Sequence, residues 1–153
     1  MPNEEHVDLT IRQAEAADVE ALARLMGELG YETRVSEMQM RLEAIAQDPR
    51  YRTFVAVKGG QVCGMIGTSA QFSYEHNDPG GRIVALVVAE KARGIGVGKK
   101  LIAAAENDFA QRNIRRIAVN THLRRKEAHE FYESVGYTKT GFRFVKTLGV
   151  SAD

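Results

Sequence analysis

The chain has 153 residues, of which 44% are hydrophobic. This is enough for one compact core and too few for two ordinary domains, so we expect a single domain over residues 1–153 with a flexible tail at 1–7. The net charge of +1 offers no general field for nucleic acid or an acidic membrane. No apolar run reaches the roughly 18 residues of a membrane span, and the lone Cys63 excludes an intramolecular disulfide. We expect a cytoplasmic protein without nucleic-acid or membrane partners.

Hydrophobic periodicity in the first half predicts a strand near residues 8–14, then two helices over 17–29 and 36–47. Asp18 is a candidate cap or first-turn acid, Gly30 is placed to end the first helix, and Ser36 is a candidate N-cap of the second. Two strand-like runs joined by Gly59-Gly60 predict an antiparallel hairpin. The apolar run "GGRIVALVVAE" at 80–90 predicts a strand covered on both faces.

The second half continues the alternation of strands and helices. Apolar residues recur at every fourth position from Val97 to Phe109, which predicts a helix. A strand at 114–122, a helix at 126–136 and an extended segment at 142–148 follow. The predicted order is β-α-α-β-β-β-α-β-α-β, an α/β (α+β) class.

Residues 93–100, "RGIGVGKK", which we call the glycine loop, have the composition of an anion site. Alternating glycines free successive backbone N–H groups at the positive end of a helix, and Arg93, Lys99 and Lys100 add charge. A Walker A loop needs four residues between its glycines and a Ser or Thr after the lysine, and a dinucleotide fingerprint needs its third glycine one residue later. Neither fits. The alternative is a tight turn without a ligand, but three glycines with flanking cations favour an anion.

Two segments resemble the GCN5-related N-acetyltransferases. "LVVAEKARGIGVGKKLI" resembles their central motif, Arg/Gln-x-x-Gly-x-Gly/Ala, at Arg93, Gly96 and Gly98, and "RRKEAHEFYESVGY" resembles their later helix with Phe-Tyr followed by Gly-Tyr. The resemblance implies a GNAT fold, a mixed and mostly antiparallel sheet flanked by helices. It implies acetyl-CoA as co-substrate. The pantetheine arm would be held by the backbone of Leu86, Val87 and Val88. The pyrophosphate would be held by the backbone amides of Gly94, Ile95, Gly96, Val97, Gly98 and Lys99.

The resemblance also implies catalytic residues. Tyr132 matches the tyrosine that reaches the CoA sulfur, although its spacing alone favours a core position. Related enzymes often carry a glutamate base where this chain has Arg82. His76 and Glu75, in the loop "YEHNDPGG", are the candidate bases, and a solvated turn is an equal alternative.

Further side chains are candidates for contacts with the cofactor. His122, where related sequences often have Asn, is expected to bond pantetheine, join a proton relay or cap its strand. His129 is expected to flank the cofactor, and Arg124 and Arg125 either approach CoA phosphates or are solvated. The four histidines share no ligand-like spacing, so no metal is predicted.

The predicted activity is acetyl-CoA-dependent transfer to the primary amine of a small molecule by direct attack on the thioester. The stretch "QFSYEH", the Leu-Val-Val strand and the ending "FRFVKTL" make the chain similar to aminoalkylphosphonate acetyltransferases, which implies an acceptor with an anionic group. From its predicted strand position we hypothesise that Arg82 pairs with that anion. Protein amines and aminoglycosides remain open as acceptors. A non-catalytic acyl-CoA sensor and a protein-interaction domain are the alternatives from other classes. Family members often dimerise, so a homodimer is open as well.

Overall fold

The structure is a computed structural model that describes residues 8–120, 126–141 and 143–149. The chain divides into two compact units, Met1–Val119 and Asn120–Asp153, and each is described by itself. A single domain over the whole chain stays a prediction.

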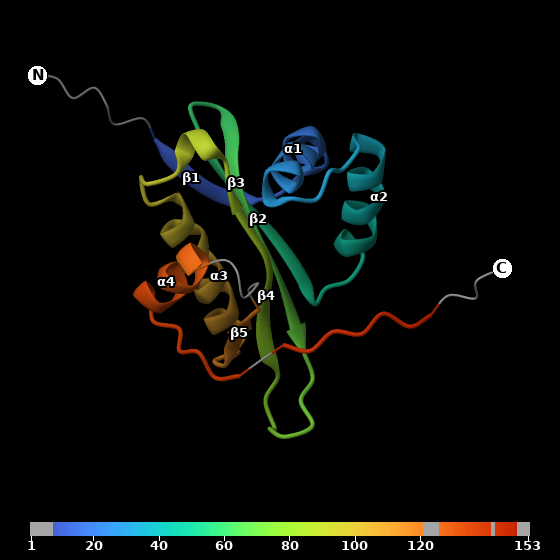
Figure 1. Cartoon of the computed structure of the whole chain (residues 1–153), viewed down its shortest axis with the longest axis vertical. Helices are drawn as coiled ribbons and strands as arrows, with labels where there is room; N and C mark the ends of the chain where they lie inside the picture. The colour runs from blue at the N-terminus through green and yellow to red at the C-terminus, as the bar shows by residue number, and fades with distance from the viewer. Residues whose placement is uncertain (1–7, 121–125, 142, 150–153) are drawn as a thin grey trace, which may run out of the picture. The chain divides into compact units, whose positions relative to one another are not determined.

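The N-terminal unit contains a five-stranded sheet in the order β1-β2-β3-β4-β5 (Figure 1). Neighbouring strands are antiparallel, except that β5 runs parallel to β4. This is the mixed, mostly antiparallel sheet that the sequence predicts. The strands are β1 (Leu9–Gln13), β2 (Tyr51–Lys58), β3 (Gln61–Gln71), β4 (Gly80–Val88) and β5 (Ile117–Val119), and the helices are η1 (Ala16–Asp18), α1 (Val19–Leu29), α2 (Val35–Ala46), η2 (Glu90–Ala92) and α3 (Val97–Gln111).

The C-terminal unit contains α4 (Lys126–Ser134), the helix predicted at 126–136. The strand predicted at 142–148 is wrong for the described residues 143–149, which form no strand. Phe144 is 91% exposed and Leu148 76% exposed. Alternating apolar residues give only a local preference for extended backbone, and a strand also needs a neighbouring edge to pair with.

Helices cover both faces of the sheet (Figure 1). On one side, the α1–α2 face, a buried cluster joins these helices to the strands: Leu22, Ala23, Leu25, Met38, Val55, Met65 and Val87. On the other side, the α3 face, the predicted stripe of α3 is at most 1% exposed: Val97, Leu101, Ala105 and Phe109. The periodicity of each helix therefore identifies its buried side.

The ends of the elements confirm some local signals and correct others. The Gly59-Gly60 turn forms the predicted hairpin with φ of 59° and 79°, and α1 ends at Gly30 as predicted. Ser36 as N-cap is wrong, because α2 begins one residue earlier at Val35. The carboxylate of Glu37 there accepts from the Arg34 N–H at 2.9 Å, so an acid inside the first turn replaces the expected hydroxyl.

Gly81 sets the distance between β4 and α3. A Cβ atom at this position would lie 2.7 Å from Cε1 and 2.8 Å from Cζ of Phe109, whose ring is fully buried. Neither atom can move away cheaply, because the ring sits in a packed core. The approach of α3 to the sheet therefore depends on the absence of a side chain at Gly81.

We predict that Gly81→Ala lowers the free energy of unfolding by about 1–3 kcal/mol through overpacking. Gly80→Ala is the matched control, because the nearest atom to its new Cβ is the Arg116 carbonyl oxygen at 3.9 Å. Urea denaturation of both variants measures the difference. Equal stability of the two variants would refute this packing argument.

Asp18 connects β1 to the start of α1. Its carboxylate accepts two hydrogen bonds from Arg12, at 2.8 and 3.0 Å, and a third from the Glu15 N–H at 2.7 Å. Asp18 occupies the N-cap position of α1 without a side-chain bond to that helix. Its other predicted role is confirmed, because it is the acid in the first turn of η1 and its carboxylate completes a capping box with the Glu15 N–H. The Arg12 hydrogen bonds, followed by that from Glu15, lower the pKa of Asp18.

We predict that Asp18→Asn destabilises the protein at pH 7 by about 1–3 kcal/mol, because hydrogen bonds to a charged, buried acceptor are lost. A lowered pKa means that the ionised form stabilises the folded state above the unfolded pKa of about 3.9. That contribution disappears as the pH falls through the folded pKa. Denaturation at pH 7 and at pH 3 should therefore show a gap between wild type and variant that narrows in acid, and a gap independent of pH would contradict the ion pair.

Candidate active site

Strand β4 has an edge that is only half occupied. β5 pairs with β4 over Gly81–Ile83 alone, whereas β4 continues to Val88. Opposite β3, Gly67 pairs with Ala85 and Thr68 with Ile83, so Val84 is a bulge. Within residues 8–119, no strand lies against the β5 side of residues 84–88, which we call the free edge of β4.

The backbone N–H and C=O groups of successive residues in a strand point to alternate sides, and this decides which groups the free edge presents. The Ala89 N–H donates to the Cys63 carbonyl of β3 at 2.8 Å, so Val87, two residues before it, also bonds toward β3. The polar groups of Leu86 and Val88 point the other way. Val87 is also 4% exposed within the core of the α1–α2 face. Of the three residues predicted to hold a pantetheine arm, Leu86 and Val88 present their backbone groups to the free edge, and the binding role of all three stays a prediction.

The glycine loop continues from this edge and presents a row of amides. Gly94 and Gly96 have φ of 83° and 90°, a conformation that residues with a Cβ rarely adopt. None of the six N–H groups from Gly94 to Lys99 donates a hydrogen bond within residues 8–119. The first satisfied amide is that of Lys100, which donates to Gly96 O at 3.1 Å. These free N–H groups at the start of α3 have the arrangement that the predicted anion site requires.

The first turn of α3 carries positive charge, whereas the first turn of a helix usually favours negative charge. No acidic residue lies in its first turn, while Lys99 and Lys100 are exposed there. Cations are unfavourable beside the positive end of a helix dipole unless an anion is bound between them. Arg93 adds a further cation, held at the free edge by its Nε, which donates to Val88 O at 3.1 Å. These contacts support the predicted anion site.

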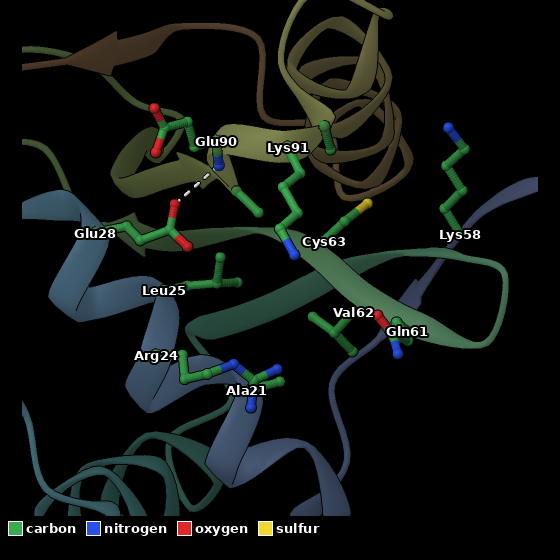
Figure 2. Close-up of a pocket in the computed structure, with 12 residues that line it drawn as sticks. Ala21, Arg24, Leu25, Glu28, Lys58, Gln61, Val62, Cys63, Glu90 and Lys91 are labelled. Carbon is green, nitrogen blue, oxygen red and sulfur yellow. Dashed lines mark hydrogen bonds between the residues drawn. The ribbon is translucent and has the colours of Figure 1, made fainter.

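A pocket of about 400 Å³ lies beside η2, between α1 and the β2–β3 hairpin (Figure 2). The Glu28 carboxylate of α1 accepts from the Glu90 N–H at 2.8 Å, which fixes the start of η2 and hence the entry into the glycine loop. Sequence reasoning missed this residue, because its partner is 62 positions away and carries no motif. Cys63 lines the pocket, and burial raises the pKa of its thiol, while Lys58 lowers it.

The candidate bases lie in the loop between β3 and β4, at the end of β4 opposite to the glycine loop (Figure 1). Ser73 Oγ accepts from the Glu75 and His76 N–H groups at 3.0 and 2.9 Å, and both of these side chains are exposed. Gly80, which follows the loop, is about 13 Å along the strand from Val84. The roles of Glu75 and His76 as bases therefore stay predictions, with a solvated turn as the alternative.

The remaining predicted residues belong to the C-terminal unit. Tyr132 is half-buried on α4 and packs edge-to-face against Tyr137 with ring centroids 6.0 Å apart. His129 is half-buried on the same helix. His122 and Arg125, together with Arg124, lie outside the described residues. Roles for all of these residues at the thioester stay predictions.

In residues 8–120, 126–141 and 143–149, no group of three or more His, Cys, Asp and Glu side chains is arranged to hold a metal ion. No helix in the same ranges is long and apolar enough to cross a bilayer.

Comparison with known proteins decides the family. The model of the acetyltransferase (GNAT) family matches residues 19–137. The chain belongs to this family. This membership identifies it as an acetyltransferase and confirms the GNAT fold expected from its two motifs.

Individual relatives agree with this assignment. The aminoalkylphosphonate N-acetyltransferase of Salmonella typhimurium is 37% identical over 101 residues, which span 66% of each chain. A GNAT family acetyltransferase structure from Staphylococcus aureus is 27% identical, covers 92% of this chain and 98% of its own, and has a TM-score of 0.80. An aminoglycoside N-acetyltransferase solved in complex with CoA shares the fold, at 19% identity, coverage of 96% and 99%, and a TM-score of 0.85.

Proposed function

We propose that the protein is an acetyl-CoA-dependent N-acetyltransferase that transfers the acetyl group to the primary amine of a small molecule. The six amides from Gly94 to Lys99, none of which donates a hydrogen bond within residues 8–119, are continuous with the free edge of β4 and carry this proposal. The amides fit the pyrophosphate of CoA, and the Leu86 and Val88 backbone fits the amides of its pantetheine arm. The GNAT relatives, one of them solved with CoA, support the same assignment.

The free edge also limits where the acetyl group lies. An arm that enters at the glycine loop runs along the edge until β5 occupies it at Ile83. The five free residues provide about 17 Å of strand. The thioester is therefore expected beside the Val84 bulge, where the irregular backbone exposes polar groups to the carbonyl.

The reaction follows from the two substrates. The neutral amine nitrogen bonds to the carbonyl carbon, the carbon–sulfur bond breaks, the thiolate takes up a proton, and the new amide nitrogen loses one. At pH 7 the neutral form of a lysine-like amine costs roughly 4–5 kcal/mol relative to its cation. β4 carries Arg82 where related enzymes often place a glutamate, so we propose that water accepts the amine proton.

Tyr132 is the proposed hydrogen-bond donor to the departing sulfur. A phenol of pKa about 10 is a weaker acid than a thiol of pKa about 8.5, so complete transfer is uphill by roughly 2 kcal/mol. A hydrogen bond that strengthens as negative charge develops on sulfur still lowers the barrier. The proposal rests on the family resemblance of "HEFYESVGY".

Gly96→Ala tests the cofactor site. Alanine disfavours positive φ by about 1–2 kcal/mol, so the loop should lose the conformation that aligns its amides, and the Kd for CoA should rise about 5- to 30-fold. Gly60→Ala is the matched control, because that glycine also has positive φ and open space around its Cβ position. Calorimetric titration with CoA measures both. An unchanged Kd in Gly96→Ala, or an equal loss in the control, would contradict the proposed loop.

Tyr132→Phe tests catalysis. We expect kcat, followed by CoA thiol release, to fall about 10- to 100-fold while the Kd for CoA stays within about twofold. Tyr137→Phe removes a hydroxyl from the neighbouring ring and should change kcat much less. In wild type, kcat/KM should rise with pH toward the pKa of the amine, since only the neutral amine attacks. An unchanged kcat in Tyr132→Phe would remove the tyrosine from the mechanism.

A further inference from the structure

The pocket beside η2, which we call the η2 pocket, is large enough for a small molecule. Its volume of about 400 Å³ falls within the range of about 300–1,000 Å³ that is typical of ligand sites. Its floor is apolar: Leu25 is buried in the core of the α1–α2 face, and Val62 and Ala89 pack against that core. Its walls come from α1, the β2–β3 hairpin and η2 (Figure 2). This floor is suited to the hydrocarbon part of a ligand.

Cations surround the η2 pocket. Arg24, Lys58 and Lys91 line it, one from each of its three walls. Within the residues that the structure describes, none of these three side chains forms an ion pair or a hydrogen bond. Figure 2 shows Arg24 and Lys91 reaching into the space between α1 and the hairpin. The positive charge of the lining is therefore available to a ligand.

The two acids of the lining do not neutralise these cations. The Glu28 carboxylate already accepts a hydrogen bond from the Glu90 N–H at 2.8 Å. The side chain of Glu90 points away from the ammonium group of Lys91 (Figure 2). Cations gathered around one cavity repel each other, and an anion between them relieves that repulsion. The lining therefore favours a ligand with an acidic head and an apolar body.

The η2 pocket and the proposed CoA site lie on opposite sides of η2. The Ala89 N–H donates to the Cys63 carbonyl of β3, which places the pocket on the β3 side of the chain that leaves β4. The free edge of β4 faces the β5 side. η2 separates the two sites: the Glu28–Glu90 hydrogen bond holds its start, and the glycine loop follows its end. A ligand in the pocket therefore acts on an element that leads directly into the glycine loop.

We propose that the η2 pocket binds a small organic anion, a carboxylate or phosphate ester with a short hydrocarbon body, and that this anion strengthens CoA binding. An anion held by Arg24 of α1 and Lys91 of η2 adds a second link between two elements that Glu28 already joins. The added link stabilises the start of the glycine loop, so the loop loses less entropy when CoA binds. Anion binding in the pocket is independent of the proposed transferase function, whereas its effect on CoA rests on that function.

Three ligands that share a six-carbon chain test the pocket. Hexanoate, hexyl phosphate and hexylamine end in a carboxylate, a phosphate and an ammonium group. Cys63, the only cysteine of the chain, lines the pocket and reports its occupancy through the rate of alkylation by iodoacetamide. Without CoA, we expect at least one of the two anions to slow alkylation at least about threefold at a concentration where hexylamine has no effect. The anion that protects Cys63 at the lower concentration identifies the acidic head.

Two results of this assay would overturn the inference: no protection by either anion, and protection by hexylamine at least as strong as that by the anions. Charge-removing variants then locate the anion. Arg24→Gln and Lys91→Gln should each weaken its binding about three- to fivefold, the loss expected for an exposed charge contact. Arg115→Gln, an exposed arginine outside the pocket, is the matched control and should bind like wild type. Unchanged binding in either pocket variant, or an equal loss in the control, would contradict the proposed bridge.

Calorimetric titration with CoA, with and without the protecting anion at saturation, tests the coupling. The anion should lower the Kd for CoA at least about fivefold, and CoA should strengthen anion binding by the same factor. Glu28→Ala should raise the Kd for CoA, and the anion should then lower it by a larger factor than in wild type, because it replaces the lost link. A Kd for CoA that the anion leaves unchanged or raises would overturn the coupling and leave the transferase standing. A protein that binds no CoA, with Cys63 still protected, would refute the transferase and the coupling and support the anion site.

Discussion

The structure depends on backbone polar groups of β4 and α3 that the N-terminal unit leaves without hydrogen bonds. β5 stops pairing with β4 after Ile83, and the next irregularity, the Val84 bulge, turns the rest of the strand into a free edge. The unbonded amides of the glycine loop follow directly. Unsatisfied backbone groups are costly unless solvent or a ligand pairs with them. Their alignment in one continuous row supports the proposed role in binding, since a sheet selected only for stability would pair this edge.

Packing on both faces holds that row in place. On the α3 face, the contact of Gly81 with Phe109 and the buried stripe of α3 fix the helix whose first turn carries the amides. On the α1–α2 face, Glu28 reaches across to Glu90 and anchors the short helix that leads into the loop. The packing of these two layers therefore positions both ends of the loop. A ligand then meets a preorganised site and loses less entropy on binding.

Sequence reasoning succeeded where one physical signal dominates. Helix periodicity identified the buried stripe from Val97 to Phe109, and the glycine spacing identified the loop, because each depends only on nearby residues. It failed where a feature depends on contacts between elements that are far apart in the sequence. The Val84 bulge and the Glu28–Glu90 contact depend on register and on packing between elements far apart in sequence. The strand predicted at 142–148 failed for a related reason, since alternation cannot supply a neighbouring edge.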